Sequence, residues 1–233
     1  IPVSPVHRNI VLIALVIGLC LPAGIIYLHR LFDTTIDGRE DVEKLTSIPI
    51  LGELPHWQQP NGNALISECE PTESIVEAFR VLRHGIHFLR RDARVFICTS
   101  STPGQGKTFV STNIAVALAM TGKRVLLVDG DIRRRTLSCK FRSTAGLTGI
   151  LIEEDDAPIS LAENVVVDAI YKGVDLLPSG IQPPNPAELL MSERLEKFVE
   201  IARASYDYII FDATPAFAVA DAEILSRVSD LML

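Results

Sequence analysis

The chain has 233 residues, 48% of them hydrophobic, and its formal net charge is −7 at pH 7. This acidic balance argues against nucleic acid as the main partner. Four cysteines are scattered without CxxC or metal-ligand spacing, which argues against a disulfide scaffold or a zinc site and favours reduced thiols. About 200 residues follow an N-terminal apolar run, enough for one α/β domain with a substantial core.

The N-terminal apolar run predicts a membrane-spanning helix. From Ile10 to Leu28 there is no charged residue, and the run is interrupted only by Pro22. About 20 apolar residues suffice to cross the hydrocarbon core of a bilayer. A cleaved signal peptide would have a shorter apolar core and a small-residue cleavage site, and a buried core helix is the other alternative.

Domain boundaries follow from this helix. We expect a proline-containing periplasmic juxtamembrane segment at 1–8, the transmembrane helix at 9–30, a cytoplasmic linker at 31–70 and an α/β domain at 71–233. Basic residues are more numerous after the apolar run than before it, which weakly places the larger part of the chain in the cytoplasm. A nucleotide site would require the same side of the membrane.

Local patterns divide the next part of the chain. We expect a charged connector at 31–45, a short strand at 48–52, a polar loop at 58–63 and a helix at 71–90. The helix is predicted by apolar residues that recur at spacings of four and three. These residues are Ile75, Phe79, Leu82, Ile86 and Leu89.

The polar side of this helix carries Glu77, Arg80 and Arg83, which lie close enough on a helix to form one ridge. Because the apolar stripe accounts for packing against the domain, we expect the ridge to face outward. Intrahelical ion pairs are its simplest explanation. The functional alternative is a head-to-tail contact with the next subunit of a ring.

A strand, a glycine-containing loop and a helix then occur in the order that a phosphate-binding loop requires. The apolar strand 95–98 leads to the loop 101–108, and an amphipathic helix follows from 109 to about 121. Small residues let the backbone wrap a phosphate, and the first N–H groups of the helix point at it. An ordinary glycine-rich turn is the alternative, and Ser101 stands where the usual motif has glycine.

Within this loop, Lys107 supplies a cation for the β- and γ-phosphates, and the hydroxyl of Thr108 can bind Mg²⁺. The residues expected to bind nucleotide are Pro103, Gly104, Gln105, Gly106, Lys107, Thr108 and Phe109.

Two further apolar strands end in aspartates. Residues 124–128 lead to Asp129 and Asp131, and residues 208–211 lead to Asp212. In a parallel sheet these ends meet at one edge, where ligands of open α/β folds bind. Asp212 suits Mg²⁺, which takes hard oxygen ligands, and Asp129 or Asp131 adds a ligand or a general base. A lone aspartate at a strand end is more often a helix cap or a turn residue.

The rest of the chain completes an α/β pattern. We expect short helices and loops at 136–158, strand within 165–177 and helix within 185–204. Residues 230–233 look like the start of a strand, so we expect the C-terminus to be incomplete. Apolar strands alternating with helices predict a P-loop NTPase-like, mostly parallel sheet with helices on both faces, preceded by one transmembrane helix.

Four segments resemble motifs of the bacterial tyrosine kinases (BY-kinases). Residues 101–108 resemble their Walker A motif, 128–133 their second, kinase-specific aspartate motif and 210–215 their Walker B motif. The ridge on helix 71–90 matches the E-x-x-R-x-x-R pattern through which these kinases assemble into rings. The proline segment and apolar run resemble the end of a chain-length determinant (polysaccharide co-polymerase) module, which is fused upstream in many of them.

The resemblance implies an ATP-dependent protein-tyrosine autokinase that regulates capsular or exopolysaccharide polymerisation and export at the bacterial inner membrane. Its cofactors would be ATP and Mg²⁺. Its partners would be other copies of the chain in an octamer-like ring, a neighbouring subunit's tyrosine tail, the polysaccharide polymerase and export machinery, and the membrane. No nucleic acid is expected.

The resemblance also implies roles for single residues. Lys107 would stabilise charge on the transferring phosphoryl group, and Thr108, Asp131 and Asp212 would hold Mg²⁺. A tyrosine hydroxyl has a pKa near 10, so a carboxylate should help to remove its proton. We assign that role to Asp129, with Asp131 supporting the metal or its waters, and the reverse assignment stays open. For Arg133, a nucleotide-binding role and a solvated helix position are equally compatible with the sequence.

The sequence departs from the family pattern in two places. Walker B usually carries two consecutive prolines, whereas Thr214 precedes Pro215 here and Ala216 follows it. The tyrosine-rich tail is missing, because the tyrosines are at 27, 171, 206 and 208. We therefore expect the acceptor tyrosines beyond Leu233 or on another protein.

Two alternative functions remain at this stage. The deviant-Walker ATPases of plasmid partition and division-site placement share the fold, but they require a signature lysine where this chain has Thr102. A membrane co-polymerase scaffold with an inert nucleotide site is the other alternative, and the intact lysine, threonine and aspartates argue against it.

Overall fold

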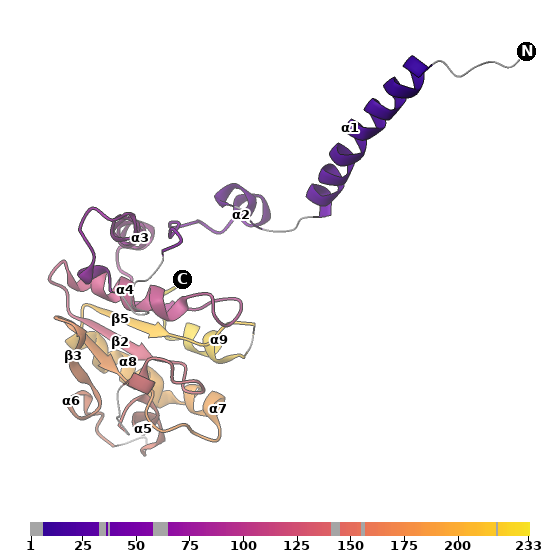
Figure 1. Cartoon of the computed structure of the whole chain (residues 1–233). Helices are drawn as coiled ribbons and strands as arrows, with labels where there is room; N and C mark the ends of the chain where they lie inside the picture. Colours follow the sequence, from indigo (N-terminus) through magenta and orange to yellow (C-terminus); the bar gives the residue numbers. More distant parts are fainter. Residues whose placement is uncertain are drawn as a thin grey trace, which may run out of the picture. The chain divides into compact units, whose positions relative to one another are not determined.

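The structure is a computed structural model, and it describes residues 7–32, 36, 38–57, 65–140, 145–154, 157–217 and 219–233 (Figure 1). The chain divides into two compact units, Ile1–Ile50 and Leu51–Leu233. The second unit starts earlier than the residue 71 expected for the α/β domain, because Leu51, Leu54 and Ile66 pack into its core. The loop predicted at 58–63 and most of the segment predicted at 1–8 lie outside the described residues.

The first unit contains two helices. Helix α1 (His7–Phe32) includes Ile10–His29, which is long and apolar enough to cross a membrane, judged by length and composition. Helix α2 (Arg39–Leu45) lies in the stretch expected to be a charged connector. Acidic residues in its first turn and a lysine in its last turn favour a helix there, because they complement the helix dipole.

The second unit is built around a six-stranded sheet. Its strands are β1 (Val95–Cys98), β2 (Val125–Asp129), β3 (Val166–Tyr171), β4 (Val174–Leu177), β5 (Tyr208–Asp212) and β6 (Leu231–Met232). Their order across the sheet is β3-β4-β2-β5-β1-β6, and every neighbouring pair is parallel except β3 and β4. The predicted mostly parallel sheet is confirmed, and the strand expected within 165–177 is an antiparallel hairpin.

Seven α-helices accompany the sheet among the residues described for this unit. They are α3 (Ser74–Leu89), α4 (Lys107–Ala119), α5 (Leu147–Ile152), α6 (Leu161–Asn164), α7 (Pro186–Leu190), α8 (Glu193–Ser205) and α9 (Asp221–Ser226), with 3-10 turns at Ile66–Glu68 and Ser138–Lys140. Helix α4 begins two residues before the predicted start, so its first turn contains Lys107 and Thr108. The helix expected within 185–204 is divided into α7 and α8, because Ser192 is extended between them.

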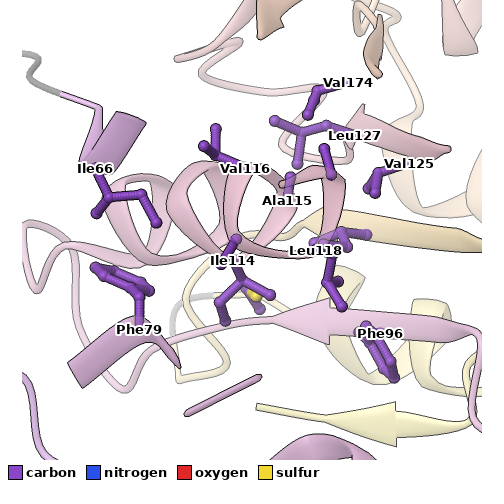
Figure 2. Close-up of a cluster of buried hydrophobic side chains, with 14 of the residues drawn as sticks. Ile66, Phe79, Phe96, Ile114, Ala115, Val116, Leu118, Val125, Leu127 and Val174 are labelled. Carbon is purple, nitrogen blue, oxygen red and sulfur yellow. The ribbon is translucent and has the colours of Figure 1, made fainter. Parts of the chain in front are cut away.

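Successive side chains of a strand point to opposite faces of the sheet. The side chains of the central strands therefore pack into two separate cores. On β1, Phe96 packs with α3 and α4, whereas Val95 and Ile97 pack with α5, α7, α8 and α9. Figure 2 shows the first core, in which α4 lies between the sheet and the side chains of Ile66 and Phe79. The prediction of helices on both faces is confirmed.

Three local expectations are wrong, each for a packing reason. Among the described residues 46–57 there is no strand, so the strand predicted at 48–52 does not form. Leu89 does not belong to the buried stripe: it is 43% exposed, because the helix ends there. Residues 113–119 of α4 are all buried, so that half of the helix is not amphipathic. It is covered by α3 and the turn Ile66–Glu68 on the side away from the sheet.

Candidate nucleotide site

The loop between β1 and α4 has the backbone of a phosphate cradle. Gly104 and Gly106 have φ angles of 85° and 86°, a left-handed conformation that glycine adopts without strain. Helix α4 has no acidic residue in its first turn. Its first N–H groups and its dipole therefore favour an anion at this end.

Strand register brings the predicted carboxylates to this loop. On neighbouring parallel strands, Cys98 at the end of β1 pairs with Asp212 of β5, and Asp212 pairs with Asp129 of β2. The three strand ends are thus adjacent, as the sequence predicted. Asp131 lies two residues beyond the end of β2, and all three carboxylates are buried.

Lys107 and Thr108 contact these carboxylates directly. The Lys107 ammonium lies 3.5 Å from Asp212 Oδ1 and 3.6 Å from Asp131 Oδ2, and the Thr108 hydroxyl donates to Asp212 Oδ2 at 2.6 Å. Burial raises the pKa of Asp212, although Lys107 and the Thr108 hydroxyl act in the opposite direction. The lysine side chain is 11% exposed, so these contacts form away from bulk water.

The oxygen donors at this point fit a magnesium ion. Among the described residues, Asp131 Oδ2 and Asp212 Oδ1 are buried and accept no hydrogen bond. Together with the Thr108 hydroxyl they are the hard ligands that Mg²⁺ prefers. The described residues contain no group of three His, Cys, Asp or Glu side chains arranged to hold a metal alone.

Asp129 is held differently from the other two aspartates. Its Oδ2 accepts hydrogen bonds from both the backbone N–H and the hydroxyl of Ser138, and Ser138 Oγ in turn accepts from the N–H of Ser179 at 2.7 Å. Burial raises the pKa of Asp129 to about 6, although the Ser138 hydrogen bonds lower it. Its Oδ1 has no hydrogen-bond partner among the described residues.

Arg133 is not a solvated helix residue, because its guanidinium is held by an ion pair. Part of the guanidinium is therefore not available to a ligand. It forms a two-point ion pair with Asp221 at the start of α9, with Nε–Oδ2 at 2.7 Å and Nη2–Oδ1 at 3.1 Å. The Asp221 carboxylate is fully buried. Arg133 also lines a small cavity with Asp131 and Thr214, so the pair keeps the arginine at the edge of the site.

Two predicted nucleotide contacts are changed by packing. The Phe109 ring lies 5.9 Å from the Trp57 ring and 5.8 Å from the Phe79 ring, so its side chain belongs to the first core. The part of Phe109 left for phosphate is its backbone N–H, at the third position of the helix. Gln105 Oε1 accepts from Ser101 Oγ at 2.9 Å and from the Thr102 N–H at 3.2 Å, which closes the loop on itself.

The ridge on α3 faces outward only in part. Glu77 and Arg80 are exposed by 64% and 39% and form an ion pair at 3.1 Å. Arg83 instead turns toward α4 and donates to the carbonyl oxygen of Ala117 at 2.8 Å. The expectation of an outward-facing ridge therefore fails for Arg83, because the last turn of α4 offers it an unpaired carbonyl.

Sequence reasoning missed three groups that shape the site: the Ser138–Ser179 pair behind Asp129, Asp221 behind Arg133, and the buried hydroxyl of Thr214. None of these residues belongs to a spacing pattern that would have identified it. The one available signal was the departure from two consecutive prolines in this segment, where Pro215 stands between Thr214 and Ala216.

Comparison with known proteins agrees with this geometry. A family model described as an AAA domain matches residues 94–233. The tyrosine-protein kinase YwqD of Bacillus subtilis is 40% identical over 170 residues, which cover 71% of this chain and 70% of YwqD. The tyrosine-protein kinase Wzc of Salmonella typhimurium is 31% identical over 243 residues, which cover 96% of this chain and 33% of Wzc.

Among solved structures, the kinase domain of the Escherichia coli tyrosine kinase ETK is similar, with a TM-score of 0.74 and 29% identity over 85% of this chain and 80% of that chain. The chain spans most of YwqD and about a third of the length of Wzc. The matches cover the phosphate loop and the strands that carry the three aspartates. The chain belongs to the bacterial tyrosine-protein kinase family and has its P-loop α/β fold.

Proposed function

We propose that this chain is an ATP-dependent protein-tyrosine kinase that is anchored in the inner membrane and regulates capsular or exopolysaccharide polymerisation and export. The observation that carries the proposal is the convergence of Lys107 and Thr108, in the first turn of α4, with Asp131 and Asp212. A phosphate cradle beside carboxylate oxygens that accept no hydrogen bond is what nucleotide-dependent phosphoryl transfer needs. The tyrosine-kinase relatives support tyrosine as the acceptor.

The proposed reaction exchanges one phosphorus–oxygen bond for another. The bond from the γ-phosphorus of ATP to the β–γ bridging oxygen breaks, a bond to the tyrosine oxygen forms, and ADP leaves. The Lys107 ammonium stabilises negative charge on the phosphoryl oxygens. Its contacts with Asp131 and Asp212, at 3.5–3.6 Å, are long enough for a phosphate oxygen to compete for the same cation.

The metal-binding side of the site would use Thr108, Asp131 and Asp212, whose oxygens are hard ligands beside the start of α4. A bound Mg²⁺ would neutralise charge that develops on the β- and γ-phosphate oxygens. The N–H of Arg134 donates to Asp131 Oδ1 at 3.0 Å, which leaves Oδ2 directed to the lysine and the metal-binding side.

In this proposal Asp129 is the base that accepts the proton of the tyrosine hydroxyl. Its Oδ1 is buried without a hydrogen-bond partner among the described residues, and Ser138 fixes the carboxylate through Oδ2. Burial raises the pKa of Asp129 to about 6, which suits a carboxylate that must be ionised at neutral pH and still accept a proton. Ser138 thus orients the base.

Assembly and location are further parts of this proposal. Helix α1 would anchor the chain, with the unit Leu51–Leu233 in the cytoplasm, where ATP is present. The exposed pair of Glu77 and Arg80 would contact the next copy in a ring, octamer-like by family resemblance. The ring would bring a neighbour's tyrosine tail to each ATP site. The export machinery would be the regulated partner, and the N-terminal segment would be the end of a fused chain-length determinant module.

A phosphotyrosine assay tests the proposal. The full chain in detergent micelles is incubated with ATP, Mg²⁺ and a synthetic glutamate–tyrosine copolymer, and phosphotyrosine is detected with an antibody. Lys107→Met should lower the rate by at least about 100-fold, because it removes the cation beside the phosphoryl group. Lys123→Met is the matched control and should leave the rate within about twofold, because Lys123 is an exposed partner of Asp207 just before β2.

Other outcomes separate the alternatives. ATP hydrolysis without phosphotyrosine would favour an ATPase of the partition or division-site type. Failure to bind nucleotide would favour an inert membrane scaffold. A folded Lys107→Met variant that works at the unmodified rate would contradict the assignment of the site.

A further inference from the structure

Thr214 has a hydroxyl that the fold buries and leaves unpaired. The residue is 2% exposed, and its Oγ1 has no hydrogen-bond partner among the described residues. Burying a hydroxyl without a hydrogen bond costs free energy, so nearly all such groups in folded proteins have a partner. A buried hydroxyl without one next to a ligand site is a candidate for a bond that the ligand supplies.

The backbone holds Thr214 in a fixed place. On either side of it, the N–H of Ala213 donates to Cys98 O at 3.0 Å and the N–H of Ala216 donates to Ser100 O at 2.8 Å. The hydroxyl of Thr99 donates to the carbonyl oxygen of Thr214 itself at 2.7 Å. The segment after β5 is therefore tied to the start of the phosphate loop, and the side chain of Thr214 has little freedom to move away.

Thr214 lines a cavity of about 130 Å³. The cavity lies between Pro103 of the phosphate loop, Asp131 and Arg134 of the loop after β2, and Thr214 with Pro215 of the loop after β5. A whole small-molecule ligand usually occupies about 300–1,000 Å³. This cavity is smaller, so it can hold one end of a nucleotide bound along the phosphate loop.

The cavity wall carries charges of both signs. Arg133 is paired with Asp221. Asp131 shares the Lys107 ammonium with Asp212. Arg134 is exposed, and the described residues give its side chain no hydrogen-bond or ion-pair partner. Arg134 is thus the cation of the wall that is left for a phosphoryl group.

We propose that the Thr214 hydroxyl is a positioning group that donates a hydrogen bond to the terminal phosphoryl group of the nucleotide. The inference rests on the nucleotide-binding part of the proposed function. A contact with the γ-phosphoryl group would distinguish a nucleoside triphosphate from a diphosphate.

Nucleotide titrations test this contact without measuring catalysis. The dissociation constants of ADP and of a non-hydrolysable ATP analogue are measured, with Mg²⁺, for the full chain and for Thr214→Val and Thr214→Ser. Valine keeps the shape of the side chain and removes the hydrogen-bond donor. Thr214→Val should therefore raise the dissociation constant of the analogue about tenfold and leave that of ADP within about twofold. Serine keeps the donor and should retain the preference for the analogue.

Thermal stability separates positioning from a structural role. Thr214→Val should not lower the melting temperature, because the hydroxyl it removes has no partner to lose. Thr148→Val is the matched control: the Thr148 hydroxyl donates to Ser179 O at 2.6 Å, and its removal should lower the melting temperature. A fall in melting temperature for Thr214→Val as large as for Thr148→Val would indicate a structural role and overturn the proposal.

The affinities give the other decisive results. If Thr214→Val lowers the affinities for ADP and for the analogue equally, or lowers neither, the role of Thr214 is overturned even if the chain makes phosphotyrosine. Conversely, a selective loss of the analogue would support the role of Thr214 even if the copolymer stays unphosphorylated. The two proposals can therefore fail separately.

Discussion

Asp230 is predicted to contribute measurably to stability, because one carboxylate joins three elements. Its Oδ2 accepts from the N–H groups of Arg94 and Val95 at 2.7 and 2.8 Å, and its Oδ1 accepts from Arg203 at 2.8 Å. These bonds connect the residue before β6 to the start of β1 and to α8. The carboxylate therefore fixes the end of β1 that lies opposite the phosphate loop.

The expected contribution of Asp230 to the free energy of unfolding follows from the pKa of its carboxyl group. Burial alone would raise the pKa of Asp230, but the hydrogen bonds from Arg203, Arg94 and Val95 outweigh it and lower the pKa to about 2. Compared with the ordinary value of 3.8, this corresponds to about 2 kcal/mol of stability. Because the pKa is lowered on folding, the contribution is complete above pH 3.8 and is lost as the pH falls toward 2.

The test is urea unfolding of the full chain in detergent micelles, followed by the fluorescence of Trp57, the single tryptophan. At pH 7, Asp230→Asn should lower the free energy of unfolding by about 2 kcal/mol, and the difference should fall to roughly half at pH 3. Asp92→Asn is the control: this side chain is 80% exposed, so we expect no measurable change. A loss below about 0.5 kcal/mol for Asp230→Asn at pH 7, or a loss independent of pH, would refute the reasoning.

Three further predictions concern the site, the ridge and the second core. Asp129→Asn should lower the rate of phosphotyrosine formation by about 10²–10⁴-fold with little change in melting temperature, and a rate equal to that of the unmodified chain would exclude it as the base. Arg83→Ala should lower the free energy of unfolding in urea by about 1–2 kcal/mol, because it removes the hydrogen bond to the carbonyl oxygen of Ala117. Arg80→Ala should lower it by less than about 0.5 kcal/mol, but it should dissociate large oligomers in sedimentation. Arg194→Met should destabilise by at least about 3 kcal/mol, because this side chain is 1% exposed and its guanidinium donates to the carbonyl oxygens of Ile150 in α5 and of Ala157 after α5. A loss within experimental error would contradict that role.

Local order along the sequence was enough to predict the centre of the site. The strand, loop and helix around Lys107 follow one another directly, so their relative placement depends on a short stretch of backbone. The aspartates needed one more step, the general property that parallel strands present their carboxyl ends at one edge. The register of Asp212 with Asp129 and Cys98 agrees with that step.

The sequence was less informative where burial depends on a neighbour that is distant along the chain. A strand was expected at 48–52, whereas among the described residues 46–57 there is no strand, and Leu51 packs into the core of the second unit instead. Leu89 fits the helical period, yet it is 43% exposed at the residue where α3 ends. Phe109 was expected at the nucleotide, and its ring instead packs between Trp57 and Phe79.

What the sequence by itself determined is the class of fold and the meeting of the loop before α4 with the aspartates at one edge of the sheet, because these depend on strand–loop–helix order and on strand ends. Only the tertiary structure decided which partners hold the groups at the edge of the site. Ser138 holds Asp129, and Asp221 lies 88 residues from the Arg133 that it pairs. Such contacts depend on the strand order and on how α9 packs in the second core. Neither can be predicted from the spacing of residues along the sequence. The unpaired hydroxyl of Thr214 belongs to the same class, because burial and the lack of a partner are properties of the folded chain alone.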